Sequence, residues 1–352
     1  MKKVLHLLSS NQYSGAENVA CQIIEAFRND IEMVYCSPNG PISNILKSKN
    51  VNYLPLDNLS FKEVKEIIKT FRPDLIHAHD IKASLIAAHC SKNIPVISHL
   101  HGRFEDMSKI SVKSLLYRTY IKKFSHIFAV SESIIKEYYF SNALSNKSSV
   151  LYNVVNQEKL VNMVSVEEKE TEFDCVYLGR FSYPKNPQRL IYIISKVVEK
   201  IPNSTFVLIG DGDLLDEAKK LAEKLKVQKN ILFKGFLNNP YQLVSASKVM
   251  ILTSRSEGTP MCVLESMLLG VPIVSTAVDG IKELIENKVD GFYYEKDENI
   301  VNAICKLITD EQLRNSVSKN AYNKAIKINN IDNYKSHILN VYSNNILIDN
   351  LR

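Results

Sequence analysis

The sequence predicts an α/β protein made of two doubly wound domains, each a parallel sheet covered by helices. Three observations support this fold class. Short apolar runs alternate with amphipathic stretches of helical period, which implies parallel strands joined by right-handed crossovers. The rhythm stops once, in the charged and apolar-poor stretch 165–171, and then restarts. The length of 352 residues also suits two domains.

The first domain is predicted over residues 1–165. The start of the chain is basic and then briefly apolar, and we interpret it as a first strand, not as a signal peptide. Helices are expected at Glu17–Phe27 and at Phe61–Phe71, where apolar residues recur at helical spacing. Asp80 is the expected N-cap of another helix. The predicted strands are Val4–Leu8, Glu32–Tyr35, Asn52–Leu56, Leu75–Ala78, Pro95–Leu100 and His126–Val130.

A second domain with the same rhythm is predicted over residues 166–330, and the stretch 165–171 is the expected linker. Its predicted strands are Phe173–Leu178, Thr205–Ile209, Ile231–Lys234, Val249–Leu252 and Pro272–Thr276. The remaining stretch, 331–352, has a helical pattern. We expect the two domains to face one another across a cleft. Ligands of such sheets bind beyond the carboxyl ends of the strands.

The composition argues against several classes of protein. A net charge of +6 is too small to indicate a nucleic acid partner. The six cysteines are scattered without CxxC pairs, which argues against a metal cluster or a disulfide framework and fits a reducing cytosol. No apolar run approaches the about 18 residues that a spanning helix needs. We therefore expect a cytoplasmic protein that does not bind nucleic acid.

Three predicted loops at strand ends contain glycines or cations. Gly15 directly precedes a helix, so backbone N–H groups there can face a phosphate, although an ordinary turn glycine would look the same. Arg180 and Lys185 share one loop, where two cations suit a diphosphate; two solvated surface charges are the alternative. Gly210 and Gly212 permit close approach of the backbone, but the third glycine of a dinucleotide-binding motif is absent.

The stretch 255–265, R-S-E-G-T-P-M-C-V-L-E, joins a loop carboxylate to the start of a helix. Thr259 is the expected N-cap, and Pro260 the first helical residue. Glu257 precedes this helix, and Glu265 lies roughly 7–8 Å along its axis from Pro260, at 1.5 Å per residue. One carboxylate can bind a sugar hydroxyl while the other reaches a ribose. A buried structural acid and a loop charge are the alternative.

Four histidines lie at the ends of two predicted strands: His77, His79, His99 and His101. Alternate residues of a strand face the same way, so a pair of metal ligands is geometrically possible. The lack of cysteines and the scarcity of acids nearby argue against a metal site. We interpret His101 as a polar group that reaches a substrate hydroxyl, and His77 as a hydrogen-bonded core residue.

An ordered set of motifs resembles the glycosyltransferase family 4 enzymes. The set extends over nearly the whole chain and includes S-G-A-E, P-D-L-I-H-A-H, H-L-H-G, I-F-A-V-S-E-S, L-Y-N-V-V-N, L-G-R-F-S-Y-P-K-N, L-I-G-D-G, F-K-G-F and S-E-G-T-P-M-C-V-L-E-S-M-L-L-G-V-P. The resemblance implies the GT-B architecture, with two Rossmann-like domains and a last helix that crosses back onto the first domain. It also implies a retaining hexosyltransferase that uses a nucleotide-sugar donor, with UDP-sugar favoured.

The resemblance assigns roles at matched positions. Glu257 would bind hydroxyls of the donor sugar, and His101 would contact that sugar near the reacting carbon. Arg180 and Lys185 would hold the diphosphate, and these four residues form the predicted catalytic set. The other residues predicted to bind the donor are Gly15 at the phosphate, Glu265 at the ribose, Gly235 and Phe236 at the base, and Gly210, Gly258, Thr259, Pro260 and Met261.

The implied mechanism needs neither a metal nor a cofactor. Cations and helix N-termini would stabilise the leaving diphosphate, and the acceptor hydroxyl would attack from the same face and give its proton to the leaving oxygen. The chain departs from many family members at Ser14-Gly15, where those have two glycines, so the closeness of the backbone to the phosphate stays open. Met261-Cys262 also replaces bulkier aliphatic pairs, which matters little if both face the core.

The expected acceptor is a hydroxyl of a saccharide or a lipid-linked sugar, by analogy with relatives that build surface polysaccharides such as capsule. Residues 103–124 interleave six cations with apolar and aromatic side chains. This pattern predicts either a basic amphipathic helix at an anionic membrane, at the inner face of which the protein would act, or an ordinary helix with a solvated basic face. A sugar-nucleotide epimerase and a non-catalytic nucleotide-sugar-binding subunit are the alternative functions.

Overall fold

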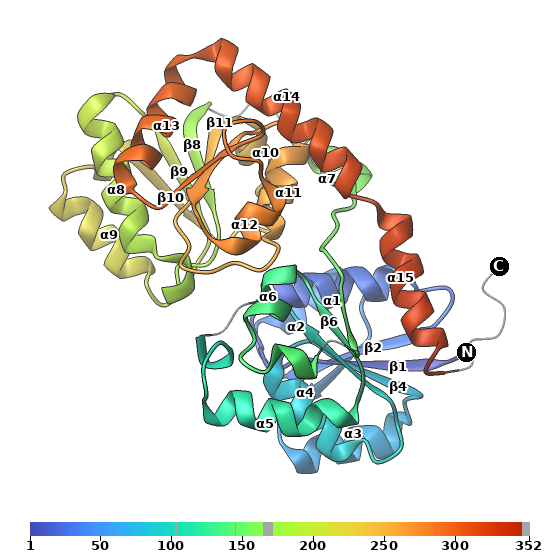
Figure 1. Cartoon of the computed structure of the whole chain (residues 1–352). Coiled ribbons are helices and arrows are strands. Elements are labelled where there is room, and N and C mark those ends of the chain that lie inside the picture. The colour runs from blue at the N-terminus through green and yellow to red at the C-terminus, as the bar shows by residue number, and fades with distance from the viewer. Residues whose placement is uncertain (103–104, 145, 165–171, 347–352) are drawn as a thin grey trace. The chain divides into compact units, whose positions relative to one another are not determined.

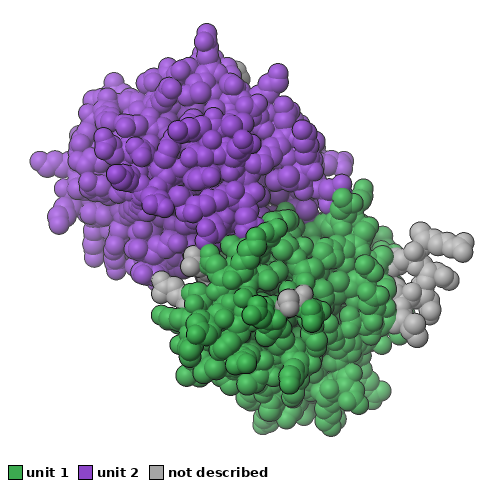
Figure 2. All heavy atoms as spheres, viewed as in Figure 1, with its two compact units in different colours: residues 1–153, 332–352 green, residues 154–331 purple. Residues whose placement is uncertain are grey.

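The chain is described from a computed structural model, which covers residues 1–102, 105–144, 146–164 and 172–346. It divides into two compact units (Figure 2). Unit 1 comprises Met1–Asn153 and Asp332–Arg352, and unit 2 comprises Val154–Ile331. Each unit has its own apolar core of strand and helix residues, as expected for separate domains.

The first unit ends before the predicted boundary at residue 165. The helix α7 (Gln157–Val164) packs against α10 (Tyr241–Ser245), which is part of unit 2. The backbone N–H of Val155 also donates to the side chain of Asn329 at 2.7 Å. These contacts explain why residues 154–164 belong with the second unit. The predicted linker 165–171 lies outside the described residues.

Among the described residues of unit 1, seven parallel strands form one sheet in the order β3-β2-β1-β4-β5-β6-β7 (Figure 1). The strands are β1 (Lys3–Leu7), β2 (Glu32–Pro38), β3 (Tyr53–Leu56), β4 (Leu75–Ala78), β5 (Val96–Leu100), β6 (Phe124–Ala129) and β7 (Ser148–Val150). The six predicted strands are confirmed. Strand β7 was not predicted because it is short and mostly polar. The strand order reverses between β1 and β4, which makes this pair the topological switch point of the sheet.

Helices connect these strands in the expected alternation. They are α1 (Gly15–Ala26), α2 (Ile42–Ser48), α3 (Phe61–Phe71), α4 (Ile81–Cys90), α5 (Val112–Tyr120) and α6 (Glu132–Glu137), with short 3-10 turns at η1 (Glu105–Met107), η2 (Ile121–Lys123) and η3 (Ser141–Ala143). The predicted N-cap of α4 is confirmed, because Asp80 accepts from the N–H of Ala83 at 2.8 Å. Its other oxygen accepts from the N–H of Ser9, which ties the loop after β1 to the start of α4.

The last helix, α15 (Ile331–Ser343), packs on unit 1, as the resemblance implied. The Tyr342 hydroxyl lies 2.7 Å from Nδ1 of His77 in β4. His337 lies 2.9 Å from the hydroxyl of Ser149 in β7. The two contacts lie on different strands, so α15 spans part of the sheet face that carries the histidines.

Unit 2 repeats the design. In its described part, six parallel strands form a sheet in the order β10-β9-β8-β11-β12-β13. They are β8 (Phe173–Leu178), β9 (Phe206–Ile209), β10 (Ile231–Gly235), β11 (Ser247–Leu252), β12 (Ile273–Thr276) and β13 (Phe292–Tyr294). The five predicted strands are confirmed, and β13 is additional. The order reverses between β8 and β11, so the second switch point lies there.

The connecting helices of unit 2 cover both faces of its sheet (Figure 1). In addition to α7 and α10 they are α8 (Pro187–Lys200), α9 (Leu215–Lys224), α11 (Met261–Leu268), α12 (Asp279–Leu284), α13 (Asp297–Thr309) and α14 (Glu311–Ile328), with 3-10 turns at η4 (Tyr183–Lys185) and η5 (Gln228–Asn230). Strands buried on both faces need continuous apolar runs, and this is why the short apolar stretches were reliable signals.

Candidate active site

The switch point of the unit 2 sheet brings two predicted site residues into contact. Lys185 lies in the loop after β8, and Glu257 lies in the loop after the neighbouring strand β11. The Lys185 ammonium lies 2.6 Å from Oε1 of Glu257 and 2.7 Å from Oε2. The Glu257 side chain is 7% exposed and that of Lys185 is 26% exposed. Two residues predicted from separate loops therefore form one ion pair where ligands of such sheets bind.

Hydrogen bonds between the two loops hold this pair in place. The Thr253 hydroxyl donates to the carbonyl oxygens of Lys185 and Asn186, at 3.2 and 3.1 Å. The backbone N–H of Arg255 donates to the carbonyl of Pro184 at 2.7 Å. Asn186 has a φ of 53°, a left-handed conformation that asparagine tolerates better than most residues, and this residue turns the chain into α8. Sequence reasoning missed Thr253 because a buried threonine at a strand end gives no distinctive signal.

The Glu257 carboxylate has a second partner on its own loop. The Ser254 hydroxyl donates to Oε1 of Glu257, and the Thr276 hydroxyl donates to the Ser254 carbonyl at 2.7 Å. Burial alone lowers the pKa of Lys185, but the adjacent Glu257 carboxylate raises it, and the net pKa is above its ordinary value. Lys185 therefore carries its charge at neutral pH. The Lys185 ammonium can bind an anionic ligand in place of Glu257, and the Glu257 carboxylate can then accept a hydrogen bond from a ligand hydroxyl.

Helix α11 begins one residue later than predicted. Its N-cap is Pro260, with φ −69° and ψ 118°, and Met261 is its first residue, so the prediction of Thr259 as the N-cap is wrong. The fixed φ of proline suits extended backbone as well as a helix, and its missing N–H leaves nothing to satisfy at either position. Gly258, Thr259, Pro260 and Met261 are all buried, so this segment is part of the packed edge of the sheet.

Glu265 lies inside α11 and is 6% exposed. Its Oε1 accepts a hydrogen bond from the hydroxyl of Tyr241 in α10 at 2.9 Å. A buried carboxylate that already accepts from a phenol is held in one orientation. Tyr241 was not predicted, because nothing in the local sequence shows that α10 reaches α11.

Close approach of the backbone requires glycine at positions 210, 212 and 280. Gly210 has a φ of 138°, and a Cβ on it would lie 1.9 Å from the carbonyl oxygen of Gly179. The backbone that approaches Gly210 is that of Gly179 in the loop after β8, and the predicted role of Gly210 in donor binding stays a prediction. A Cβ on Gly280, at the start of α12, would lie 1.5 Å from the carbonyl oxygen of Gly258. Gly280 therefore supports the segment after Glu257, and sequence reasoning missed it.

The remaining donor-binding candidates have open surroundings. Arg180 is exposed at the start of the Lys185 loop, and its carbonyl accepts from the Tyr177 hydroxyl at 2.9 Å. Gly235 has a φ of 67° with open space around its Cα, and Phe236 is 51% exposed. Gly15 begins α1, and a Cβ on it would meet nothing within 4 Å. Sterics do not require glycine at position 15, so the predicted approach to a phosphate stays a prediction.

The four predicted histidines of unit 1 lie together with a fifth, His6. Strand β1 pairs with β4 so that His6 lies beside His77, and β4 pairs with β5. His79 Nδ1 lies 2.9 Å from His101 Nε2, and His6 Nδ1 lies 2.9 Å from His79 Nε2. The prediction that His77 is a hydrogen-bonded core residue is confirmed, because it is fully buried and contacts Tyr342. His6 was missed because it stands alone in the apolar run of β1.

Burial keeps these rings uncharged. It lowers the pKa of His6 and of His101 to about 3, and it lowers those of the other three rings well below the ordinary value. Within the described residues, two triads have nitrogens close enough for a metal: His6 with His77 and His79, and His79 with His99 and His101. Several of those nitrogens face one another at hydrogen-bond distance, however, so they share protons instead of converging on one point.

The segment predicted as a basic amphipathic helix folds only in part as one. Residues 103–104 lie outside the described residues, and the continuous helix is α5, Val112–Tyr120. Tyr117 is fully buried, whereas Ile110, Val112 and Leu116 are 61%, 77% and 45% exposed. The apolar side chains are therefore divided between the core and the surface. No helix in the described part of the chain is long and apolar enough to cross a membrane.

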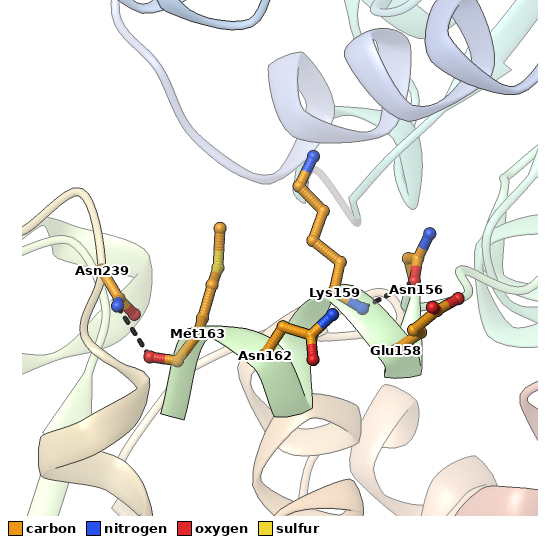
Figure 3. Close-up of a pocket in the computed structure, with 6 residues that line it drawn as sticks. All are labelled: Asn156, Glu158, Lys159, Asn162, Met163 and Asn239. Atoms are coloured by element: carbon orange, nitrogen blue, oxygen red, sulfur yellow. Dashed lines mark hydrogen bonds between the residues drawn. The ribbon is translucent and has the colours of Figure 1, made fainter. Parts of the chain in front are cut away.

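A pocket of about 400 Å³ lies elsewhere in unit 2, along α7 (Figure 3). It is lined by Asn156, Glu158, Lys159, Asn162, Met163 and Asn239. Asn239 donates to the Met163 carbonyl at 2.9 Å, which links the loop before α10 to the end of α7. None of its lining residues was predicted as a site residue.

Two family models match the chain in succession. The model described as Glycosyltransferase Family 4 matches residues 13–159, and the one described as Glycosyl transferases group 1 matches residues 159–324. The first stretch contains strands β4 and β5 with their histidines, and the second contains Lys185 and Glu257. The chain is also 28% identical, over 383 residues, to the UDP-Gal:alpha-D-GlcNAc-diphosphoundecaprenol alpha-1,3-galactosyltransferase of Escherichia coli, a match that covers 97% of this chain and 96% of that protein.

A second relative is N-acetyl-alpha-D-glucosaminyl L-malate synthase of Bacillus anthracis, at 25% identity over 76% of this chain and 74% of that protein. Among solved structures, HepE of Anabaena in complex with UDP and glucose has a TM-score of 0.86 at 22% identity, and covers 98% of this chain and 100% of that one. Its complex with UDP-glucose has a TM-score of 0.83 at 20% identity, with the same coverage. These similarities establish a shared fold over nearly the full length.

Proposed function

Because the chain belongs to glycosyltransferase family 4 and has the GT-B fold, we propose that it moves a hexose-type sugar from a UDP-sugar to a hydroxyl of a saccharide or lipid-linked acceptor, with retention of configuration. The Lys185–Glu257 ion pair at the unit 2 switch point is the observation on which this proposal depends. UDP is favoured because the relative from Escherichia coli is named for a UDP-sugar and HepE for complexes with UDP and UDP-glucose.

In the proposed complex, contacts with the donor replace the contact between Lys185 and Glu257. The diphosphate takes the Lys185 ammonium, and Arg180 joins it from the start of the same loop. Glu257 is then free to accept hydrogen bonds from hydroxyls of the donor sugar, while Ser254 still orients it. Charge-assisted hydrogen bonds of this kind are roughly twice as strong as neutral ones. The two cations also stabilise the negative charge that grows as the diphosphate leaves.

The proposed reaction needs no separate base. The bond from the anomeric carbon to the acceptor oxygen forms while the bond to the phosphate oxygen breaks, and both lie on the same face of the sugar. The acceptor proton passes to the departing phosphate oxygen. Glu257 serves as a binding group here, because its carboxylate accepts from Ser254 and, in the proposed complex, from hydroxyls of the donor sugar. We expect no metal requirement, and an unchanged rate after removal of metals with EDTA would agree with this.

The other binding roles follow the local geometry. Glu265, oriented by Tyr241, would accept from the ribose hydroxyls, and the exposed Phe236 beside Gly235 would lie against the base. Backbone N–H groups of the segment after Glu257 would face the sugar; these positions are Gly258, Thr259 and Met261, whereas Pro260 has no N–H to offer. From unit 1, His101 would bind a donor hydroxyl, and the N–H groups near Gly15 would bind phosphate.

The proposed setting is cell-surface polysaccharide synthesis at the cytoplasmic face of the membrane. The relative from Escherichia coli is named for a diphosphoundecaprenol acceptor, which is a lipid. Exposed apolar side chains at Ile110 and Val112, flanked by the exposed Lys109 and the half-buried Lys113, give unit 1 a surface that suits an anionic bilayer.

A donor panel tests the proposed reaction. Purified protein is incubated with UDP-, GDP- and ADP-hexoses, with and without saccharide acceptors, and products are followed by mass spectrometry and by NMR of the anomeric proton. We expect UDP-dependent transfer with an α-linked product from an α-linked donor. Sugar conversion without an acceptor would identify an epimerase instead. Binding of UDP-sugar without any turnover, across all acceptors, would favour a non-catalytic subunit.

Vesicle flotation tests the proposed membrane contact. The full chain is mixed with vesicles with and without phosphatidylglycerol at low salt. We expect flotation only with the anionic lipid, and its loss in a variant with Lys109→Glu and Lys113→Glu. The matched control is Lys219→Glu with Lys220→Glu on α9, which reverses two exposed charges elsewhere. Equal flotation of the two variants would contradict a specific role for this surface.

A further inference from the structure

Ring contacts connect seven of the eight histidines in the chain. They are His6, His77, His79, His99, His101, His126 and His337, with Phe128 joining the last two to the group. Strands β1, β4 and β5 are neighbours in the sheet, so side chains of alternate residues line up across them. A row of imidazoles buried in this way must satisfy its ring nitrogens from within, because water cannot reach most of them.

Two chains of hydrogen bonds among the described residues satisfy most of these nitrogens. The first runs from His6 Nδ1 to His79 Nε2, and from His79 Nδ1 to His101 Nε2, with 2.9 Å at each step. The second runs from the Tyr342 hydroxyl through His77 to His99. The first chain has buried nitrogens without a partner at both ends, His6 Nε2 and His101 Nδ1. Both of these end nitrogens are buried, but His101 as a residue is partly exposed, whereas His6 is fully buried.

Proton counting restricts the first chain to two arrangements. Each neutral imidazole has one N–H. Three rings therefore have three protons, of which two occupy the hydrogen bonds, and the third must lie at one end. Either every ring donates towards His101, so that His101 Nδ1 carries a proton and His6 Nε2 is bare, or every ring donates towards His6, with the ends reversed. The tautomer of His101 is thus coupled to that of a residue two strands away.

We infer that His6 and His79 are positioning residues that fix His101 as a hydrogen-bond donor through Nδ1. A buried N–H without a partner is rarer in proteins than an acceptor without one, so the third proton belongs on His101, the less buried of the two end residues. A hydroxyl of the donor sugar would then accept from His101. This inference rests on the proposed role of His101 at the donor.

The tautomer can be measured directly on the full-length protein labelled with ¹⁵N-histidine. Two-bond ¹H–¹⁵N spectra distinguish protonated from bare ring nitrogens, and single His→Asn variants assign the signals. We expect His6, His79 and His101 each to be protonated at Nδ1 and bare at Nε2. A wild-type His101 protonated at Nε2 would overturn the inference. So would one equivalent of Zn²⁺ retained after dialysis against buffer containing zinc, because a metal needs the bare nitrogens that these bonds use.

Two substitutions at His6 separate positioning from packing. In His6→Asn the amide N–H can replace the Nδ1–H donor, so we expect the His101 tautomer to be kept. In His6→Leu the donor is lost, and His101 should become a mixture of tautomers, with donor turnover reduced by up to about tenfold, the effect of one hydrogen bond. His126→Asn is the matched control. His126 lies on the same face of the sheet but is hydrogen-bonded to Ser149 and not to His6, His79 or His101, so the tautomer of His101 should not change. An unchanged tautomer in His6→Leu would refute the coupling.

The wild-type spectrum keeps the inference testable if His6→Leu does not fold. The spectra also do not depend on catalysis. If His101 has the expected tautomer but the protein transfers no sugar from any donor, the proposed function fails and the arrangement of protons stands. If transfer occurs and His101 has the other tautomer, the proposed function stands and this inference fails.

Discussion

The carboxyl ends of the two sheets are built from opposite kinds of side chain. At the unit 2 switch point, a charged lysine and a buried glutamate form an ion pair that hydroxyls hold in place. In unit 1 the same edge carries imidazoles whose pKa values burial has lowered, so they are neutral at pH 7. Charge suits a diphosphate, and neutral donors and acceptors suit sugar hydroxyls. The shared fold therefore supplies the position, and the residues after each strand supply different chemistry.

The largest expected effect is loss of the charged pair. Lys185→Ala removes a cation from the proposed diphosphate site. Glu257→Gln weakens the hydrogen bonds to the sugar hydroxyls, while the side chain keeps nearly the same shape. We expect each to lower kcat/KM for sugar transfer by about 10²–10³, the range for loss of one group that stabilises a developing charge. Steady-state rates with UDP-sugar as donor measure this.

An ion pair at the opposite edge of the same sheet is the control. Lys248 lies 2.8 Å from Asp174, at the starts of β11 and β8, with 37% and 15% exposure. Lys248→Ala should cost at most about 1 kcal/mol of stability, as surface pairs do, and should leave transfer unchanged. If Lys248→Ala lowered kcat/KM as much as Lys185→Ala, the loss would reflect general damage to unit 2 and not a site at its carboxyl edge.

Acid should weaken unit 1 before unit 2. All eight histidines lie in unit 1. Burial lowers the pKa of His6 to about 3, and an unfolded histidine has a pKa of about 6.5. Between these values the unfolded chain binds a proton that the folded chain does not. The free energy of unfolding therefore falls as pH falls from about 6.5, by up to about 1.4 kcal/mol per pH unit for a ring such as His6.

Hydrogen exchange followed by mass spectrometry can locate this effect in the full chain. After equilibration at pH 7.0, 6.0 and 5.0, a common exchange pulse at one pH reports which strands have opened. We expect β1, β4 and β5 to lose protection first, while β8 and β11 keep theirs. Simultaneous loss in both sheets above about pH 5 would show that the neutral histidines do not set the acid limit of unit 1.

Glycines at the two edges should also behave differently. Gly280→Ala places a Cβ against the Gly258 carbonyl, so we expect a loss of about 1–3 kcal/mol of stability, the usual cost of overpacking, and reduced transfer. Gly15→Ala has open space and should be neutral or slightly stabilising, because alanine favours a helix. Thermal unfolding compares the two. If Gly15→Ala keeps full transfer as well, close approach of that backbone to a phosphate is wrong.

The sequence predicted residues far better than it predicted contacts. Lys185 and Glu257 stood out because each follows an apolar strand, yet they are 72 positions apart and meet only because β11 is the neighbour of β8. His6 lay unnoticed in an apolar run, since its partner His79 comes 73 positions later. Strands β7 and β13 were too short for a periodic signal. Strand neighbours set these pairings, and local patterns do not determine strand order.

The smallest expected effect tests whether the proposed ribose contact of Glu265 is independent of the Lys185–Glu257 ion pair. Tyr241→Phe removes one hydrogen bond to Glu265, worth about 0.5–1.5 kcal/mol. If Glu265 binds the ribose, KM for the donor should rise up to about tenfold while kcat stays the same, because the ribose is bound equally before and during the reaction. Tyr192→Phe, on the exposed surface of α8, is the control and should change neither. A fall in kcat with unchanged KM would instead place Tyr241 with the groups that act on the leaving diphosphate.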